Sequence, residues 1–350
     1  MQVPAGILVD IFGPRILLAI GSLFAGIACI TFSSCKYLWI AKSSRLLMGL
    51  VCSPGIVSVF YLVSKWFEAN RFAFFVGLTE TIGFAGTAIG TILLSATVLN
   101  YGWRIAILLC GFAGIAIFLI ILFVIRNKPN DNSLISNNLK KIDFKEELTN
   151  LQLIASNKQV WINGLYTGLA FSVIPAFFCL WGIPFYMDKY YLTSVQSASS
   201  IAIGLLGAGI GGPFLGWLSD YIQRRKIIMI VGSFCAAICG WIILYMTPSL
   251  HMMFLLNFIL GFSVSGYVLA FAVIKEILPE NAKGKAMGFA NMLCLLVGAP
   301  ILQPIIAHLI HGKALDTLTF KIALTPLPIA LSLSLILSFF IKETYCKDCS

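Results

Sequence analysis

Long runs of apolar residues alternate with short polar segments along almost the whole chain. The runs lie roughly at 16–34, 38–64, 72–98, 104–125, 160–186, 198–217, 227–246, 252–274, 286–310 and 321–341. Each is close to the length of about 20 residues that an α-helix needs to cross a bilayer. The pattern therefore predicts ten membrane-spanning helices. A further apolar fragment, Met1 to Val9, would rise only about 14 Å as a helix and is too short to span.

A polar segment divides this pattern into two parts. Residues 127–158 are rich in Asn, Ser and Lys, so we expect a linker between an N-terminal helical bundle at 1–126 and a C-terminal bundle at 159–350. Within the linker, residues 144–155 carry apolar side chains at helical spacing. That spacing predicts an amphipathic helix that lies along the membrane surface.

Composition makes lipid the solvent for much of the surface. Of the 350 residues, 59% are hydrophobic and 11% are charged, and the mean hydropathy is +0.94. A soluble domain carries about 25% charged residues, and no water-soluble core could bury this much apolar surface. The sequence therefore predicts an all-α membrane protein. The net charge of +10 does not indicate nucleic-acid binding, because Lys and Arg occur in short clusters between the apolar runs, as membrane topology requires.

A short charged pattern occurs twice, 210 residues apart. In each copy a Gly precedes an Asp by four residues, and an Arg follows the Asp by five. The residues of the two copies are Gly6, Asp10, Gly13 and Arg15, and Gly216, Asp220, Arg224 and Arg225. The segment around Glu80 aligns with the segment around Asn291 at an offset of 211. This repetition predicts two similar helical halves joined in tandem.

The placement of Lys and Arg sets the predicted orientation. If the first copy of the pattern faces the cytoplasm and the spans alternate from there, 17 of the 24 Lys and Arg residues lie on the cytoplasmic side. Positive residues prefer that side of a membrane. We therefore expect a multi-pass protein of the cell inner (plasma) membrane, with both copies, the linker and the C-terminus in the cytoplasm.

The first half is shorter than the second. The second half starts near Val160, and Gly216 follows about 56 residues later, after two spans, whereas Gly6 comes almost at once. Relative to the second half, the first therefore lacks roughly 50 residues, or about one helix and most of another. A misplaced start codon or a shortened gene product would each explain this difference.

The repeated pattern is similar to the signature G-x-x-x-D-[RK]-x-G-[RK]-[RK] of the major facilitator superfamily of secondary transporters. Ile11 and Pro14 depart from it in the first copy, and Gln223 replaces the second Gly in the second copy. Arg45 resembles the fourth-helix Arg of that family, and residues 83–90 resemble its glycine-rich fifth helix. The resemblance implies two pseudo-symmetric helical bundles that work by alternating access, with about 10–11 of 12 transmembrane helices remaining.

A weaker likeness concerns the solute. The stretch Leu180-Trp-Gly-Ile-Pro184, followed by the second charged pattern, resembles members near the anion:cation symporter and phthalate permease groups, and also the lysosomal dipeptide transporter type. The resemblance implies a small organic solute of the dipeptide or organic anion class, moved with a proton or another coupling ion. A shortened, non-transporting membrane protein with the same fold is the alternative.

The charged pattern itself is a candidate gate. Asp10 with Arg15, and Asp220 with Arg224 or Arg225, would pair at the cytoplasmic ends of neighbouring helices and separate as the two halves rock. The alternative is a topological anchor, in which Arg stays on the inner side and Gly allows a tight turn.

A second group of candidates lies inside the spans. Glu80 is about eight residues, or roughly 12 Å, into its helix. A carboxylate at that depth is costly unless it is protonated, paired or wetted by a cavity, so Glu80 suits proton binding and release, with a structural hydrogen bond as the alternative. Its repeat partner Asn291 cannot titrate. Arg45 could bind a substrate carboxylate or pair with an acid. The candidate site is completed by Asn163, Tyr166 and Gln303.

Other chemistry has little support in the sequence. Cys346 and Cys349 form a lone CxxC with no second pair and no nearby His, so we expect no metal site. HExxH, GxSxG and paired acids within a span are absent, so we expect no enzyme activity. The small residues at 204–212 predict close helix packing. We expect a monomer without cofactors, with the lipid bilayer and a small-molecule substrate as its partners.

Overall fold

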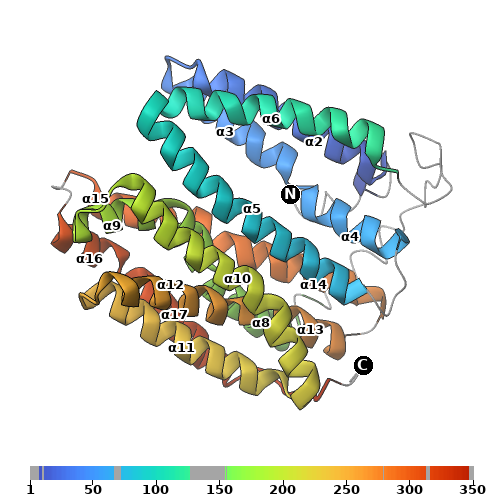
Figure 1. The fold of residues 1–350 in the computed structure, drawn as a ribbon. Coiled ribbons are helices and arrows are strands. Elements are labelled where there is room, and N and C mark those ends of the chain that lie inside the picture. The colour runs from blue at the N-terminus through green and yellow to red at the C-terminus, as the bar shows by residue number, and fades with distance from the viewer. Residues whose placement is uncertain are drawn as a thin grey trace. The chain divides into compact units, whose positions relative to one another are not determined.

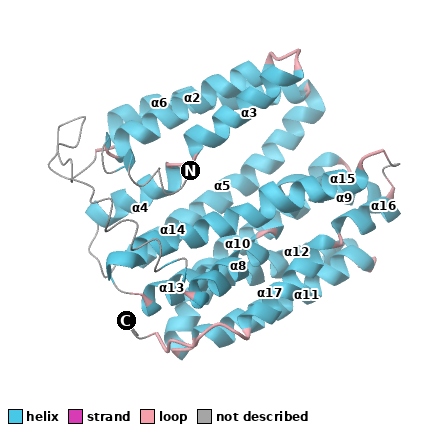
Figure 2. Cartoon of the chain, turned by 180° about the vertical axis from the view of Figure 1, so that it is seen from behind, coloured by secondary structure: helices cyan, strands magenta, loops and turns pink. Residues whose placement is uncertain are grey.

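The computed structural model describes residues 8–9, 12–66, 72–126, 154, 156–278, 280–312 and 316–346. This part of the chain consists of helices and their connections and contains no strand (Figure 2). Ten helical spans within it are long and apolar enough to cross a membrane, which confirms the predicted all-α membrane fold. The predicted amphipathic helix at 144–155 lies, apart from Ile154, outside the described residues.

The first half of the chain contributes the spans before the linker. Its helices are α2 (Pro14–Ser33), α3 (Leu38–Cys52), α4 (Gly55–Trp66), α5 (Phe72–Tyr101) and α6 (Trp103–Val124). α2 runs beside α6 and also packs on α3 (Figure 1). The contact with α6 is close, because a Cβ on Gly111 would come within 3.0 Å of the Gly26 carbonyl oxygen. Glycines at this crossing therefore let the two backbones approach.

The second half contributes six spans, and three of them contain irregular turns. Its elements are α8 (Lys158–Phe171), η2 (Ile174–Trp181), α9 (Gly182–Tyr190), α10 (Ser194–Ile222), α11 (Arg225–Tyr245), α12 (Leu250–Val264), η3 (Ser265–Tyr267), α13 (Val268–Ile277), α14 (Glu280–Leu296), η4 (Val297–Leu302), α15 (Gln303–Ile310), α16 (Thr317–Leu324) and α17 (Pro326–Ser338). η2 and η4 are π-helical and η3 is a 3-10 turn. Such segments inside long helices often mark functional sites or hinges.

The two π-helical segments pack against each other. Gln303 at the start of α15 donates from Nε2 to the carbonyl of Pro175 in η2, at 2.7 Å. A Cβ on Gly298 would lie 2.4 Å from Cγ of the same proline. Gln303, a predicted member of the substrate site, therefore ties two irregular spans together in this structure.

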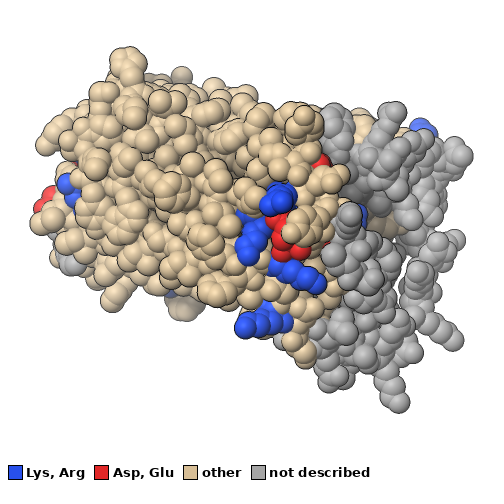
Figure 3. Space-filling view, turned by 90° about the horizontal axis from the view of Figure 1, so that it is seen from below, with Lys and Arg blue, Asp and Glu red and all other residues tan. Residues whose placement is uncertain are grey.

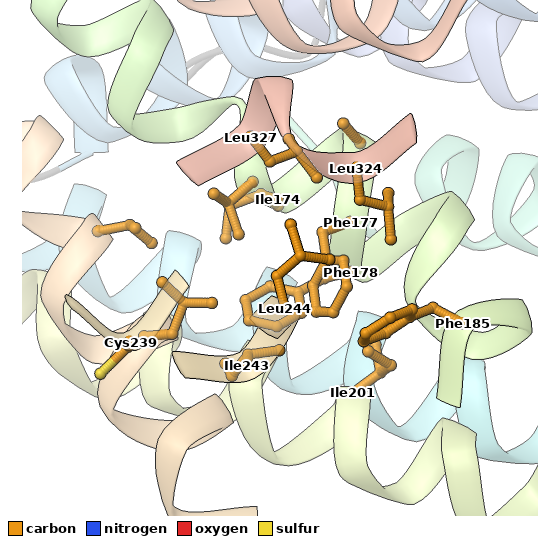
Figure 4. Close-up of a cluster of buried hydrophobic side chains, with 14 of the residues drawn as sticks. Ile174, Phe177, Phe178, Phe185, Ile201, Cys239, Ile243, Leu244, Leu324 and Leu327 are labelled. Atoms are coloured by element: carbon orange, nitrogen blue, oxygen red, sulfur yellow. The ribbon is translucent and has the colours of Figure 1, made fainter. Parts of the chain in front are cut away.

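The core of the second half is a large apolar cluster. Figure 4 shows part of it, in which Ile174, Phe177, Phe178, Phe185, Ile201, Cys239, Ile243, Leu244, Leu324 and Leu327 are labelled. Beside this cluster α10 and α12 cross at very short range. A Cβ on Gly261 would lie 1.8 Å from the Gly204 carbonyl oxygen, and one on Gly207 would lie 2.3 Å from the Phe258 carbonyl oxygen. This crossing confirms the packing role predicted for the small residues at 204–212.

Contacts divide the chain into two compact units. The first unit comprises Met1–Val76 and Leu94–Ile142, and the second comprises Gly77–Leu93 and Asp143–Ser350. The middle of α5 thus packs within the second unit, although the sequence order places it in the first half. Thr81 on α5 donates its hydroxyl to the Gly209 carbonyl on α10 at 2.9 Å. Glu80 therefore lies in the unit that contains the C-terminal half.

Candidate functional site

The first copy of the charged pattern is only partly described, because Gly6 and Asp10 lie outside the described residues. Gly13 precedes α2 with a φ of 76°, a conformation that favours glycine. The guanidinium of Arg15 donates from Nη2 to the carbonyl of Leu122 in the last turn of α6. A cation is favourable there because the last carbonyls of a helix lack partners and carry partial negative charge.

In the second copy, Arg225 lies between two acids. Its Nη1 is 3.0 Å from Oδ1 of Asp220 and its Nη2 is 2.7 Å from Oε1 of Glu276. Nε donates to the same Glu276 oxygen at 2.9 Å, and Nη1 donates to Oγ of Ser219 at 3.2 Å. The side chains of Arg225 and Glu276 are 11% and 13% exposed, whereas that of Asp220 is 66% exposed. Water screens the Asp220 pair, so Glu276 is the stronger partner of Arg225.

The segment after α17 returns to the start of α11. The carboxylate of Glu343 accepts the backbone N–H groups of Arg225 at 2.9 Å and of Lys226 at 3.1 Å. The first N–H groups of a helix have no partner within it, and a carboxylate is favourable at that end. Lys226 in turn donates from Nζ to the carbonyl of Phe339, just after α17, at 2.7 Å. The tail thus supplies the cap that the helix itself lacks.

Residues 344–346 complete this arrangement. The hydroxyl of Thr344 donates to Oε2 of Glu276, and Sγ of Cys346 lies 3.6 Å from the carbonyl oxygen of Ser219. Burial is the largest effect on the Cys346 thiol and raises its pKa, so the thiol keeps its proton at neutral pH. Arg224 lies over the ring of Tyr345, with 5.8 Å to the centroid.

We call this set the α11 corner. Its members are Ser219, Asp220, Arg225, Lys226, Glu276, Glu343 and Thr344. Figure 3 shows a face of the molecule on which Lys, Arg, Asp and Glu gather mainly in one group, while most of the remaining described surface is uncharged. Among the described residues, no group of three or more His, Cys, Asp or Glu side chains could hold a metal ion.

The sequence pattern found part of the α11 corner and missed the rest. It left open whether Asp220 pairs with Arg224 or Arg225, and the ion pair is with Arg225. It did not identify Glu276 or Glu343. The sequence does place both acids close to the end of a span, beside the predicted cytoplasmic Arg and Lys residues, and this position could have indicated them. Gly216 is placed with open space around it, since a Cβ there would meet nothing within 4 Å.

Glu80 lies half-buried on α5. Its carboxyl forms neither a hydrogen bond nor an ion pair with any residue that the structure describes. The hydroxyl of Tyr267 on η3 and the thiol of Cys294 on α14 lie within electrostatic range of it.

Asn163, Tyr166 and Asn291 also lie in the second unit. Asn163 is fully buried and donates to the Gln159 carbonyl at 2.8 Å, while its Oδ1 is buried without a partner among the described residues. The Tyr166 hydroxyl accepts from Ser233 at 3.3 Å. Asn291 is half-buried on α14, one turn before Cys294. The amide of Asn163 thus forms a hydrogen bond within its own helix, α8.

Arg45 lies in the first unit, on α3. Its side chain is exposed, and the guanidinium carbon lies 5.0 Å from the centroid of the Phe32 ring. It forms no ion pair with an acid in the described part of the chain. The ring favours a cation in this position, and the guanidinium retains donors for a carboxylate.

A family model agrees with this architecture over almost the whole chain. The model described as Major Facilitator Superfamily matches residues 1–302 and 182–343.

Curated relatives cover similar lengths. The Hexuronate transporter of Bacillus subtilis is 23% identical over 316 residues, which are 84% of this chain and 72% of the relative. The Probable L-galactonate transporter of Escherichia coli is 23% identical over 339 residues, which are 89% of this chain and 72% of the relative. The Membrane sensor protein UhpC of Escherichia coli is 24% identical over 331 residues, which are 89% of this chain and 73% of the relative.

Solved structures share the fold. A bacterial homologue of the human lysosomal transporter Spinster, in an inward-facing and occupied conformation, superposes with a TM-score of 0.71 and 14% identity, covering 97% of this chain and 85% of that chain. Its inward-facing and unoccupied conformation gives a TM-score of 0.70. At this identity the likeness concerns the fold alone.

Proposed function

The chain belongs to the Major Facilitator Superfamily of multi-pass membrane transporters, and from this premise we propose that it moves a small organic anion of the sugar-acid class, coupled to protons. The names of two relatives, a hexuronate and an L-galactonate transporter, support this class. Both named solutes carry a carboxylate and several hydroxyls. We further propose that the protein acts as a monomer in the cell inner membrane by alternating access.

Glu80 is the group that we assign to the proton. The observation that carries this assignment is a half-buried carboxyl inside a span that forms no hydrogen bond or ion pair with the described residues. An ionised carboxylate in such a place is unstable unless water or a ligand reaches it. Protonation removes the charge, so the site alternates between a neutral and a charged form as its access to water changes.

Arg45 is the group that we assign to the substrate carboxylate. A guanidinium can form two parallel hydrogen bonds to a carboxylate, and Arg45 has no acid partner among the described residues. Its contact with the Phe32 ring holds it near one position, which reduces the entropy lost on binding. Asn163, Tyr166, Asn291 and Gln303 stay secondary candidates, since the bonds of Tyr166 and Gln303 have structural roles.

The α11 corner is the part that we assign to gating, together with Gly6, Asp10, Gly13 and Arg15 of the first copy. Within the corner, Asp220 is the member suited to separate during transport, because it is 66% exposed and its pair is screened. The buried pair of Arg225 with Glu276 would stay intact as a fixed base. Arg224, Arg225 and Lys226 cluster at this end, so we place it and the C-terminus in the cytoplasm.

Uptake of labelled galacturonate into proteoliposomes tests the assignment of substrate and proton. We expect uptake that rises with an inward proton gradient, a strong loss in Arg45→Gln, and loss of the pH dependence in Glu80→Gln. Lys42→Gln is the matched control on the same helix, since Lys42 lies over Trp39 instead. Glu80→Gln uptake with an unchanged pH profile would show that the proton assignment is wrong.

A second function is favoured by one relative, which is named as a sensor. In that case the protein would bind a sugar acid without moving it. Binding measured by thermal shift together with an absence of uptake in sealed proteoliposomes would support the sensor, whereas uptake above empty vesicles would exclude it as the sole activity.

A further inference from the structure

Helices α11 and α17 pack side by side in the second unit (Figure 2). Two hydrogen bonds show that they run in opposite directions. At one end, Lys226 at the start of α11 donates to the Phe339 carbonyl after α17 at 2.7 Å. At the other end, the hydroxyl of Tyr245, the last residue of α11, lies 2.8 Å from that of Thr325, directly before α17. The two helices therefore form one continuous antiparallel face.

Exposed apolar side chains occupy both helices toward the end marked by Lys226. They are spaced by three or four residues, so each set lies on one side of its helix. The two sets comprise Ile227, Val231 and Phe234 on α11, and Leu333, Ile336 and Phe340 along α17 and just after it. From the first to the last member of the α11 set the helix rises about 10 Å, within the depth of one bilayer leaflet, about 15 Å. Acyl chains of one leaflet are long enough to cover both sets.

Three lysines lie around the same end of α17. Lys226 is at the start of α11, Lys158 begins α8, and Lys342 follows α17. α8 packs against α17, as α11 does. The amide of Gln159 joins α8 to the segment after α17, since its Oε1 accepts the backbone N–H of Lys342 at 3.0 Å and its Nε2 donates to the carbonyl of Phe340 at 3.1 Å. Lys342 is thus held next to the start of α8.

The charges of these lysines are not used within the described chain. The side chains of Lys158 and Lys342 are exposed and form neither hydrogen bonds nor ion pairs with described residues. The ammonium of Lys226 carries three donors, of which the Phe339 carbonyl takes one. The carboxylate of Glu343, next in sequence to Lys342, instead accepts the first N–H groups of α11. Cationic donors therefore remain available at this end of α17.

We propose that this face binds an anionic phospholipid, an inference that goes beyond the proposed transport. The ammonium groups of Lys158, Lys226 and Lys342 bind the phosphate of the head group, and the acyl chains lie along the apolar sets of α11 and α17. We call these three lysines and six apolar residues the lipid face. Lysine binds phosphate as a point charge, and basic clusters at the end of membrane helices suit lipid head groups.

The order of side chains along the two helices favours a lipid over a soluble anion. A free phosphate would meet the lysines alone, whereas an exposed apolar surface that adjoins them calls for an apolar partner. A phospholipid carries both parts in the same order, with an anionic head group at the end of two apolar chains. The charge and the apolar surface of the lipid face are thus matched by one molecule.

Brominated lipids test the proposal, because bromine quenches the fluorescence of a Trp that it contacts. Phe234→Trp places a reporter within the lipid face. Leu255→Trp places one at an exposed position of α12, outside it. The signal is the difference between each variant and its parent in phosphatidylcholine vesicles that contain an increasing fraction of brominated lipid. We expect brominated phosphatidylglycerol to quench the Phe234→Trp reporter at a much lower fraction than brominated phosphatidylcholine does, and the two lipids to quench the Leu255→Trp reporter equally.

Removing lysines should abolish this preference. Each Lys near the membrane surface raises the affinity for an anionic lipid about fivefold. We therefore expect Lys158→Gln together with Lys342→Gln to raise the half-quenching fraction of brominated phosphatidylglycerol by roughly 25-fold. Lys42→Gln together with Lys275→Gln is the matched control, because it removes two exposed lysines from α3 and α13. We expect its half-quenching fraction to equal that of the parent.

A measurement on the unmodified chain keeps the test valid if a reporter variant does not fold. We expect phosphatidylglycerol to raise the midpoint temperature of unfolding in detergent micelles more than phosphatidylcholine with the same acyl chains. Inorganic phosphate at the same concentration should leave that temperature unchanged.

Three results would overturn the proposal, and none of them depends on uptake. Equal quenching of the Phe234→Trp reporter by the two lipids would show that the face has no preference for an anionic lipid. A preference that survives the loss of Lys158 and Lys342 would show that these lysines do not bind the head group. Stabilisation by inorganic phosphate equal to that by phosphatidylglycerol would mean that the lysines bind a free anion and not a lipid.

Discussion

The Arg residues of the repeated pattern meet different partners in the two halves. Arg15 donates to the backbone carbonyl of Leu122 at the end of α6. Arg225, at the equivalent position 210 residues later, is held by the carboxylates of Glu276 and Asp220. The described bonds of the same residue type in the same local pattern thus include a helix end in the first copy and two acids in the second. A repeated motif therefore specifies a turn, but it does not specify the bonds that secure that turn.

The residue after Arg225 performs the role of Arg15. Lys226 donates to the Phe339 carbonyl at the end of α17. Among the described residues, α17 is the last helix of the second half, as α6 is of the first. Both halves therefore place a cation on the final carbonyls of α6 or α17. In the second half, the cation that binds these carbonyls is Lys226, one residue after the position equivalent to Arg15. Arg225 is therefore available to bind the acids of the α11 corner.

We expect the largest difference in stability between the two halves when Arg225 and Arg15 are each replaced by Ala. Arg225→Ala leaves Glu276 in a largely buried site without its cation, so we expect the free energy of unfolding to fall by about 3 kcal/mol or more. Arg15→Ala removes a charged donor from a partly buried carbonyl at the end of α6, and we expect a loss of about 1.5 kcal/mol. Unfolding in mixed detergent micelles measures both. Equal losses would mean that the acids add nothing to the second corner.

The start of α11 provides the next contrast. α2 begins with Pro14, which has no N–H to satisfy, whereas α11 relies on Glu343 for two N–H groups. We expect Glu343→Ala to lower the free energy of unfolding by about 1 to 2 kcal/mol, and Glu343→Gln, which keeps an acceptor, to lower it by less. The same unfolding measurement applies. A neutral result for Glu343→Ala would show that water caps α11 equally well.

Substitutions in the turns before α2 and α11 should change the stability of the protein in opposite directions. Gln223 has a φ of 55° at the position where the first copy has Gly13, with a φ of 76°. A side chain is disfavoured in that region by about 1 kcal/mol. We therefore expect Gln223→Gly to stabilise the protein by about 1 kcal/mol and Gly13→Ala to destabilise it by at least about that amount. Thermal unfolding of both variants checks the sign, and a loss in Gln223→Gly would contradict the argument.

The smallest change in stability should come from Asp220. Its side chain is 66% exposed, so we expect Asp220→Asn to alter the free energy of unfolding by about 0.5 kcal/mol or less, and by still less in high salt. If Asp220 opens the gate, however, uptake should fall strongly in the same variant. Normal uptake together with normal stability would remove Asp220 from the mechanism and leave the α11 corner as an anchor.

Much of the fold could be predicted from the chain because membrane spans are local features. Twenty consecutive apolar residues must form a helix in lipid, whatever their neighbours are, and the ten predicted spans are present. The close packing of residues 204–212 also follows from local composition, since small side chains permit short backbone distances. The positions of Glu80 and Arg45 inside spans were likewise visible from the sequence.

The partners of the site residues could not be predicted in this way. Glu343 and Arg225 are 118 residues apart, and Glu276 and Arg225 are 51 apart, with no spacing that indicates contact. Gln303 looked like a residue of the substrate site, yet it bonds to the backbone of Pro175.

The sequence alone determined the helices, their number in the described chain and the family to which they belong, because each of these depends on short segments and on the lipid around them. The tertiary structure decided that the middle of α5 packs with the second unit, and that Glu276 and Glu343 secure Arg225. Such contacts depend on how distant helices cross, and crossing is set by the joint fit of many side chains and not by any one segment.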